Sequence, residues 1–336
     1  MADIAERAGV ALSTVSYVLS GKRRISEETR QRVLKAIADL EYRPHAGARA
    51  LASGTSHAIA LLLPKSPTEL NIQHHTFIAG AAQATGEHGY ALQLSTAPPQ
   101  PEHVSDLVDN RQADGVVLME VDMRDRRVER LRAEGYAFSV IGHCDDSDGI
   151  SYVDFDFANS MQLAVEHLVG LGHRRIVLFD EAPRHLRRYG PTVRSREAFA
   201  RLAGELGFDG TPVNVSLTLT PQGIREVARR TFEEFRPTAA VAIGLAGAIA
   251  ATGNDEIRVP RDMSVVALLN PQLAQMSSTP LTTVDFPAFE MGRVGAEMLI
   301  ERLMKPNEPT RQLLIAPPLT VRESTAEAPH SARRSP

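Results

Sequence analysis

From about residue 58 onward, the chain alternates short, continuously apolar runs with longer amphipathic stretches. A continuous apolar run of this length suits a strand buried on both faces, and helices between such strands indicate a parallel sheet covered on both sides. The pattern therefore predicts an α/β body, either two doubly wound subdomains or one (β/α) barrel. The runs are Ile59–Leu63, Tyr90–Leu94, Gly115–Met119, Phe138–Ile141, Ile176–Phe179, Ala239–Ile243 and Val265–Leu269, and the helical stretches are Phe77–His88, Asn159–Leu171 and Gln222–Phe235.

The first forty residues have a different texture, that of three short helices around a small core. Small and apolar residues recur at helical spacing until Gly9 breaks the pattern, and a second helix runs from about Ala11 to Leu19. Ser26 is a good N-cap for a third helix, with Glu27 and Glu28 at its positive end. The expected core positions are Ile4, Ala5, Ala8, Val15, Val18, Leu19, Val33, Leu34, Ile37 and Leu40.

Charge is distributed unevenly between these two parts. The whole chain has a net charge of −4, but residues 1–57 hold nine Lys and Arg against six Asp and Glu, so this segment is +3 and the remainder −7. A small basic module on an acidic body suggests a nucleic-acid reader attached to a second function. Cys144 is the only cysteine, no secretory signal opens the chain and no apolar run is long enough for a membrane span, so a cytoplasmic location without a membrane partner is expected.

The segment from Asp3 to Leu19 reads D-I-A-E-R-A-G-V-A-L-S-T-V-S-Y-V-L. A helix-turn-helix needs small residues where its two helices cross and a tight turn between them, which Ala5, Ala8 and Gly9 provide. Its second helix must present polar or small side chains to the major groove of DNA. The residues expected to face outward are Leu12, Ser13, Thr14, Ser16 and Tyr17.

This segment closely resembles the LacI/GalR family of repressors through its pattern A-G-V-x-x-x-T-V-S-x-V-L. The resemblance covers nearly the whole chain, continuing at Ile25–Arg30, Tyr42–Pro44, Ala48–Leu51, Glu166–Leu168, Leu171–Ile176, Arg258–Pro260, Met263–Val266 and Pro280–Val284. It implies a periplasmic-binding-protein-like body of two Rossmann-like subdomains rather than a barrel.

The same resemblance implies what the protein does. It predicts a transcriptional regulator, expected to act as a repressor, that binds a palindromic double-stranded operator as a homodimer and responds to a small effector in its cleft. The predicted domains are a helix-turn-helix over 1–44, a hinge helix or linker over 45–56, an effector-binding and dimerisation domain over 57–324 and a disordered tail over 325–336.

Carried over by position, the resemblance assigns roles at the DNA. The base-contacting positions are Leu12, Ser13, Tyr17 and Leu51, and the phosphate-contacting positions are Thr14, Ser16, Ser20, Ser26 and Thr29. Leu51 matches the leucine that inserts between base pairs in the minor groove, whereas Gly47 replaces a bulkier hinge residue. Many members have Arg at the position of Tyr17, and tyrosine cannot make the bidentate contact to guanine, so Tyr17 either reads a base or lies over the sugar-phosphate backbone.

The effector side departs further from the family pattern. The family's Arg anchor falls in the segment Thr192–Phe199, where the register places Ser195 on the anchor with Arg194 and Arg196 beside it; Arg196 is the preferred candidate, and a solvated helix start is the alternative. Leu269 occupies the position of a carboxylate that would accept sugar hydroxyls, which favours a more apolar effector than an ordinary sugar, or none. Further candidate effector-binding residues are Asn270, Asp154 and Phe286.

Enzyme functions find little support in the sequence. The phosphate-binding and nucleophile motifs of common enzymes are missing, and we predict no cofactor and no metal. The pairs His74/His75 and His167/His173 lack metal-ligand spacing, so surface or capping roles are expected. Two rival functions remain open, a sugar-binding transport receptor, which would require export, and a sugar-active enzyme, which would require a convergent acid–base pair.

Overall fold

The computed structural model describes residues 2–20, 23, 25–40, 55–63, 72–95, 100–181, 188–215, 220–253 and 257–329. Most of the predicted hinge, including Gly47 and Leu51, lies outside these residues. No helix in the described part of the chain combines the length and apolar character that crossing a membrane requires.

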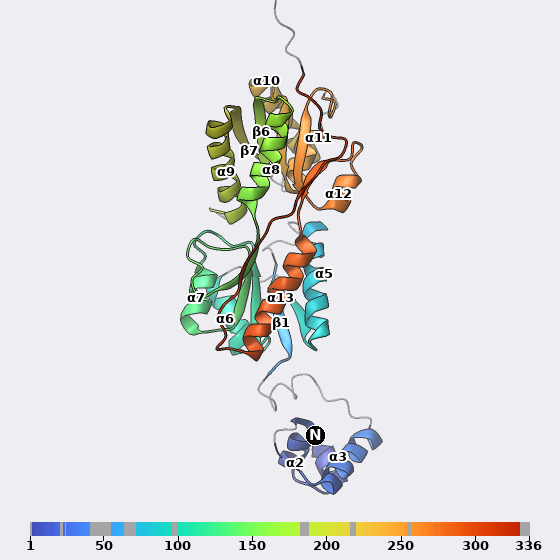
Figure 1. Ribbon diagram of the computed structural model, residues 1–336. Helices are drawn as coiled ribbons and strands as arrows, with labels where there is room; N and C mark the ends of the chain where they lie inside the picture. The colour runs from blue at the N-terminus through green and yellow to red at the C-terminus, as the bar shows by residue number, and fades with distance from the viewer. Residues whose placement is uncertain are drawn as a thin grey trace, which may run out of the picture.

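The N-terminal part forms a three-helix unit with its own core, as predicted. The helices are α1 (Ala2–Ala8), α2 (Leu12–Ser20) and α3 (Glu27–Asp39), drawn in blue in Figure 1. The completely buried side chains of Ile4, Val15 and Val33 form the centre of the core. Gly9 has φ +60° in the turn between α1 and α2, a backbone conformation that favours glycine.

Two core positions predicted for α3 are wrong. Leu34 and Leu40 are exposed, while Val33 and Ala36 are buried and Ile37 packs beside them. The reason is helix geometry, since positions 33, 36 and 37 share one face and position 34 lies about 100° away from 33. Leu40 is the C-cap residue, beyond the last turn that faces α1.

The body contains two separate six-stranded sheets, so the expectation of two subdomains is confirmed and a barrel is excluded. The first subdomain has the strand order β11-β5-β4-β3-β1-β2, and every pairing in it is parallel. Its strands are β1 (Ala58–Leu62), β2 (Ala91–Ser95), β3 (Gly115–Met119), β4 (Phe138–Ile141), β5 (Ser151–Phe155) and β11 (Gln312–Ile315).

Helices cover both faces of this first sheet because alternate strand residues point to opposite sides. Ile59 and Leu61 of β1 join one core cluster with α5 (Ile72–Glu87) and α13 (Ala288–Met304). Their neighbours in β1 face a second cluster, which contains residues of α6 (Pro101–Asp109) and α7 (Arg126–Glu134). Figure 1 shows α13 and α5 side by side in the lower half of the body.

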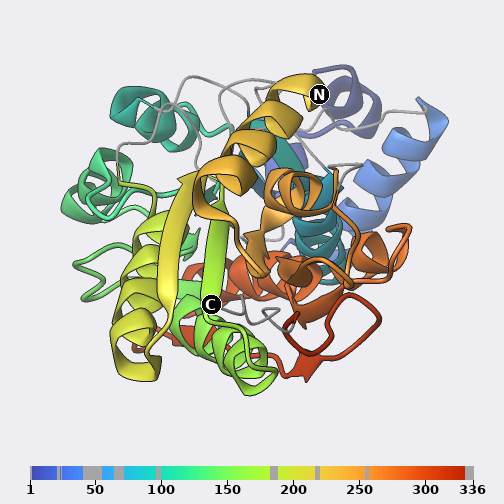
Figure 2. The same cartoon turned by 90° about the horizontal axis from the view of Figure 1, so that it is seen from above.

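The second subdomain repeats this architecture with the order β12-β10-β9-β8-β6-β7. Among its described strands, β12 alone runs antiparallel to its neighbour. Helices α8 and α9 pack on one face and α10 and α11 on the other, as the view from above shows (Figure 2). The elements are β6 (Arg175–Asp180), β7 (Asp209–Asn214), β8 (Ala239–Ile243), β9 (Ser264–Leu269), β10 (Thr282–Asp285), β12 (Leu319–Thr320), α8 (Phe157–Gly170), α9 (Gly190–Leu206), α10 (Pro221–Phe235), α11 (Gly244–Thr252) and α12 (Pro271–Gln275).

The order of the described elements makes the chain pass between the subdomains three times. It leaves the first sheet after β5, returns between β10 and α13, and crosses again between β11 and β12. Asp154 is in the strand before the first crossing and Phe286 directly follows the strand before the second. These two candidate effector-binding residues therefore lie beside crossings between the subdomains.

The predicted start of a disordered tail at residue 325 is wrong. Ala326 N–H donates to Ser264 Oγ at 3.0 Å, and Ala328 N–H donates to the carbonyl of Leu171 at 2.8 Å. These bonds hold residues 325–329 on the second subdomain. The Thr325 hydroxyl adds hydrogen bonds to His167 and Thr282. The composition of the segment did not reveal this, because several of its contacts are made by the backbone and do not depend on residue type.

Candidate DNA-binding face and ligand cavity

Helix α2 presents a face to solvent while its opposite face is buried. Val15 is completely buried, Leu12 is 52% exposed and Ser13 is exposed beside it. Tyr17 is half-buried, and the guanidinium of Arg23 lies over its ring at 5.7 Å from the centroid. Tyr17 thus holds a cation at this face, a partner that the sequence motif did not single out.

The start of α3 lies on a second candidate contact surface. Ser26 caps the helix as predicted, because its Oγ accepts from the N–H of Thr29 at 3.4 Å and donates to Thr29 Oγ1 at 2.8 Å. Ser26 is exposed and Thr29 is half-buried. Thr14 in α2 is also half-buried, whereas the side chains of Ser16 and Ser20 lie outside the described residues.

A cavity of about 110 Å³ lies between the two subdomains of the body. It lies at the carboxyl ends of the parallel strands, which is where ligands bind in sheets of this kind. Asp154 and Phe286 line it, as expected from the sequence. Much of its wall is apolar, and its polar lining residues in the described part of the chain are Gln73, His74, Glu120, Asp154, Glu181 and Tyr189.

Glu120 directly follows β3 and has a strained backbone. Its φ is +52°, a left-handed conformation that is uncommon for residues other than glycine. Its Oε1 atom lies 3.0 Å from Nε2 of His74, and its Oε2 atom is buried without a hydrogen-bond partner. A buried carboxylate oxygen left without a donor is costly, so this atom is available to a ligand.

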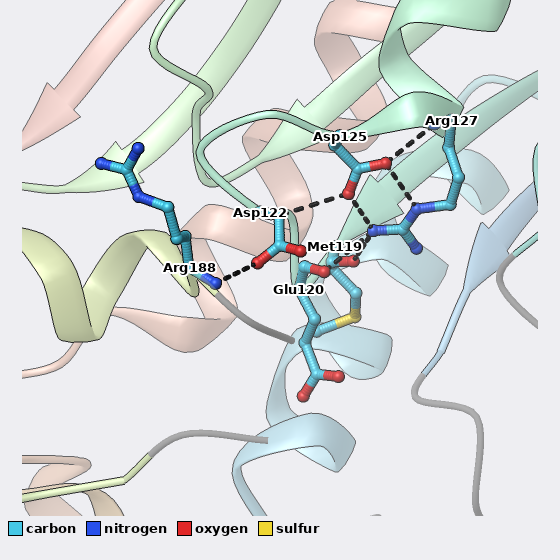
Figure 3. A network of polar contacts seen from close by, with 6 residues as sticks. All are labelled: Met119, Glu120, Asp122, Asp125, Arg127 and Arg188. Carbon is cyan, nitrogen blue, oxygen red and sulfur yellow. Dashed lines mark hydrogen bonds and ion pairs between the residues drawn. The ribbon is translucent and has the colours of Figure 1, made fainter. Parts of the chain in front are cut away.

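A buried ion pair supports the conformation of Glu120 (Figure 3). Arg127 contacts Asp125 through Nε at 3.0 Å and Nη2 at 2.7 Å, and the same Nη2 donates to the carbonyl of Glu120 at 2.8 Å. Burial raises the pKa of the Asp125 carboxyl, but hydrogen bonds and charge from Arg127 outweigh it and lower that pKa below its ordinary value. The pair therefore stays ionised and fixes the turn that carries Glu120.

Glu181 enters the cavity from the other subdomain, directly after β6. Burial raises the pKa of its carboxyl to about 7; the N–H of Ala246 opposes this rise and the charge of Glu120 adds to it. Gly244 packs closely against this carboxyl group. Its φ is +68°, and a Cβ at this position would lie only 2.7 Å from Oε2 of Glu181, so a larger residue would collide with the carboxylate. Burial, followed by the charges of Glu120 and Glu181, raises the pKa of Tyr189 well above its ordinary value.

Contacts across the cleft join the subdomains beside the cavity. Met123 N–H donates to the carbonyl of Arg188 at 2.9 Å. Arg188 N–H donates to Oδ1 of Asp122 at 3.0 Å, a bond drawn in Figure 3. Arg194 of α9 reaches the first subdomain, where its Nη1 donates to Oδ2 of Asp154 at 3.3 Å and its Nη2 donates to the carbonyl of His143. We call these contacts the cleft latch.

The structure separates the residues predicted to anchor an effector. Arg196 pairs with Asp180 outside the cavity lining, with Nε 2.5 Å from Oδ2, and is therefore not placed as an anchor. Ser195 is completely buried and its Oγ has no partner. Asn270 caps α12 by accepting from Gln272 N–H at 2.9 Å, away from the cavity. Arg194 touches the cavity indirectly, through Asp154.

Leu269, the residue on which the expectation of a more apolar effector was based, does not lie at the cavity. It is the last residue of β9, it is buried in the core, and it is not among the residues that line the cavity. Glu120 and Glu181 supply acceptors from other strands. His74 is also not a surface residue, since it is 8% exposed and contacts Glu120. His173 is likewise buried, between Thr238 and Ser264.

Comparison with known proteins agrees with both parts of the structure. The sequence profile "Bacterial regulatory proteins, lacI family" matches residues 1–45, and "Periplasmic binding protein-like domain" matches residues 165–325. The regulator MalR of Streptomyces coelicolor is 31% identical over 98% of this chain and 97% of its own length. The ribose operon repressor of Escherichia coli is 28% identical over 96% of this chain and 99% of its own length.

Solved structures show the same fold at lower identity. The lac repressor dimer bound to operator and an anti-inducer has a TM-score of 0.77 at 23% identity and covers 96% of this chain and 98% of its own. The complex of the regulator CelR with cellobiose has a TM-score of 0.68 at 23% identity, with 96% and 98% covered. These relatives are transcriptional regulators and not enzymes, and the chain belongs to the LacI/GalR family of bacterial transcriptional regulators, with a DNA-binding helix-turn-helix at its N-terminus.

Proposed function

We propose that the protein binds a palindromic operator as a homodimer and that a small molecule in the cleft controls this binding. The observation that carries the proposal is the orientation of α2, whose face with Leu12 and Ser13 is exposed while Val15 holds the opposite face in the core. In this arrangement α2 enters the major groove, and Ser26 and Thr29 at the start of α3 contact phosphates. Leu51 inserts into the minor groove between the half-sites.

An exposed apolar groove supports the homodimer. Ile72, Met276 and Phe289 line it and are 50%, 81% and 40% exposed. Apolar side chains of this size gathered on one surface favour a contact with a second copy. The lac repressor, whose fold the chain shares, is a dimer on its operator in the solved structure.

The cavity and the cleft latch support control by an effector. The cavity is lined from both subdomains, so a ligand in it contacts Glu120 on one side and Glu181 on the other. A ligand that prefers one relative arrangement of the subdomains shifts the population toward it. That arrangement sets the spacing of the two DNA-binding units in the dimer, and thereby the affinity for operator. Related regulators have been solved with cellobiose and with ribose.

A titration on two DNAs tests the DNA-binding proposal. A palindrome from upstream of the protein's own gene and a scrambled duplex are compared by fluorescence anisotropy for the Ser13→Ala variant. We expect a loss of about 1–3 kcal/mol on the palindrome and little change on the scrambled DNA, because a base contact carries specificity.

The matched control is Ser278→Ala, which removes the hydroxyl of an exposed serine on the body. It should leave both affinities unchanged. Equal losses on the two DNAs for Ser13→Ala would show that α2 does not read bases, and a failure of the unmodified protein to shift any duplex would contradict the function as a whole.

A further inference from the structure

The cavity brings together two acidic side chains from opposite subdomains. Glu120 and Glu181 are close enough for the charge of one to raise the pKa of the other, and both are largely removed from solvent. Burying one carboxylate without a counter-charge is unfavourable, and burying two near each other is more so. Their arrangement therefore calls for a compensating positive charge.

The described part of the protein supplies little of that charge. No Lys or Arg is among the described residues that line the cavity, and His74 is the one basic group in that lining. His74 faces Oε1 of Glu120, so Oε2 of Glu120 stays buried and unpartnered. Asp154, the third carboxylate, is already neutralised by Arg194.

Aromatic rings complete the wall around these carboxylates. Phe77, Phe157 and Phe286 all line the cavity and are nearly buried. The rings of Phe77 and Phe286 meet edge to face with centroids 6.0 Å apart, and Phe157 lies 6.4 Å from Phe286. Ring faces attract cations, most strongly where water is excluded.

We propose that the ligand of this cavity is a small organic cation, with an ammonium group placed between Glu120 and Glu181 and an apolar body against the phenylalanine rings. The proposal rests on the proposed function, because it names the ligand class of the same regulatory site. A neutral polyol could accept and donate hydrogen bonds here, but it would leave Oε2 of Glu120 and the ionised form of Glu181 without a counter-charge. The strained backbone of Glu120, held by Arg127, fits a side chain kept in place for a ligand.

Matched cation and alcohol pairs test the proposal on the full-length protein. Choline is compared with its neutral isostere 3,3-dimethyl-1-butanol, phenethylamine is compared with 2-phenylethanol, and glucose serves as the neutral sugar. Binding is measured by isothermal titration calorimetry at about pH 8, where Glu181 is mostly ionised. We expect at least one cation to bind, and to bind at least about tenfold more tightly than its neutral partner.

Variants of the cavity test whether the carboxylates cause the preference for a cation over its neutral partner. Glu120→Gln should lower the affinity for the cation at least about tenfold and leave the affinity for the neutral alcohol unchanged, because the amide keeps the shape of the carboxylate but loses its charge. The exposed Glu226→Gln should change neither affinity. Choline keeps its positive charge at every pH, so any pH dependence of its affinity comes from the protein. The affinity should rise from about pH 6 to pH 8, because Glu181 loses its proton over this range. The other titratable groups that face Glu181 in the cavity are Glu120, His74 and Tyr189.

Two results would overturn the proposal. One is a neutral partner or glucose that binds as tightly as the cations, and the other is no response to either cation. The operator titration on the same preparations keeps the two proposals distinguishable. If the protein binds operator but prefers neutral ligands, only the proposal of a cationic ligand is contradicted. If it binds cations but no operator, only the proposed regulatory function is contradicted.

Discussion

Glu181 makes the stability of the free protein depend on pH. Its ordinary pKa is 4.5, and burial raises the pKa in the folded state to about 7. A raised folded-state pKa contributes stability that is fully present below about pH 4.5 and is lost as the pH rises through about 7. We therefore expect the melting temperature to fall between about pH 5 and pH 8, with a contribution of up to about 3 kcal/mol from this group.

The Glu181→Gln variant should flatten this profile. The amide oxygen can still accept from the N–H of Ala246, but no charge is buried when the pH rises. The variant is expected to be more stable than the parent at about pH 8 and similar near pH 5, as followed by calorimetry. A parallel curve for parent and variant would show that Glu181 does not titrate in this range.

The Arg127–Asp125 pair is a second feature at the residue scale. Both side chains are 6% exposed, so Arg127→Met leaves the Asp125 carboxylate buried without its partner and should cost about 3–5 kcal/mol in the free energy of unfolding. Arg132→Met on the same helix breaks a pair with Asp146, whose side chain is 65% exposed, and should cost less than about 1 kcal/mol. Urea unfolding of both variants measures the difference, and equal losses would contradict the assignment.

At the scale of elements, glycines set the crossing of α5 and α13. A Cβ on Gly80 would lie 2.0 Å from the carbonyl oxygen of Phe289, and a Cβ on Gly292 would lie 2.1 Å from that of Phe77. The backbones therefore touch at a distance that no other residue permits. Gly80→Ala must push the helices apart and is expected to destabilise the protein by about 2 kcal/mol or more.

Gly86 provides a matched control on the same helix. A Cβ there meets no atom within 4 Å, so Gly86→Ala should be neutral or stabilise by up to about 1 kcal/mol through helix propensity. Thermal unfolding of the two variants separates the steric cost of an added Cβ at the helix crossing from the effect of alanine on helix propensity. Similar melting temperatures for Gly80→Ala and Gly86→Ala would show that the helices can separate without cost.

The elements that the sequence predicted well are those with a continuous apolar signal. β3, β4 and β8 begin and end where the apolar runs do, because central parallel strands are buried on both faces. β7 was missed because it is an edge strand with Gly210 and Pro212 and a largely exposed surface.

The residues of the cavity were predicted only in part, because some of them have no distinctive pattern in the local sequence. Asp154 and Phe286 could be found because the family resemblance locates the crossovers. Glu120 and Glu181 are single acidic residues in unremarkable local sequence, and they meet only when two subdomains close on each other. The one available signal was their position directly after buried strands, where parallel sheets place their ligands.

At the scale of the whole molecule, the apolar groove predicts the site of self-association. Met276→Glu places a charge in the groove with Ile72 and Phe289 and should shift sedimentation velocity profiles toward monomer. Operator affinity should fall with it, because each half-site is then bound separately. Met304→Glu is the control, since Met304 is 67% exposed but does not line the groove. A Met276→Glu protein that remains dimeric would exclude this groove as the interface.

The threading of the chain has a consequence for its synthesis. Strand β11 and helix α13 complete the first subdomain but are encoded after nearly the whole second subdomain. As the polypeptide leaves the ribosome, the three N-terminal helices can reach their final form early, whereas β1 to β5 must wait without their covering helix and edge strand. A message truncated after Asp285 would yield the helix-turn-helix attached to two incomplete sheets, so the two-subdomain body can form only when translation is almost complete.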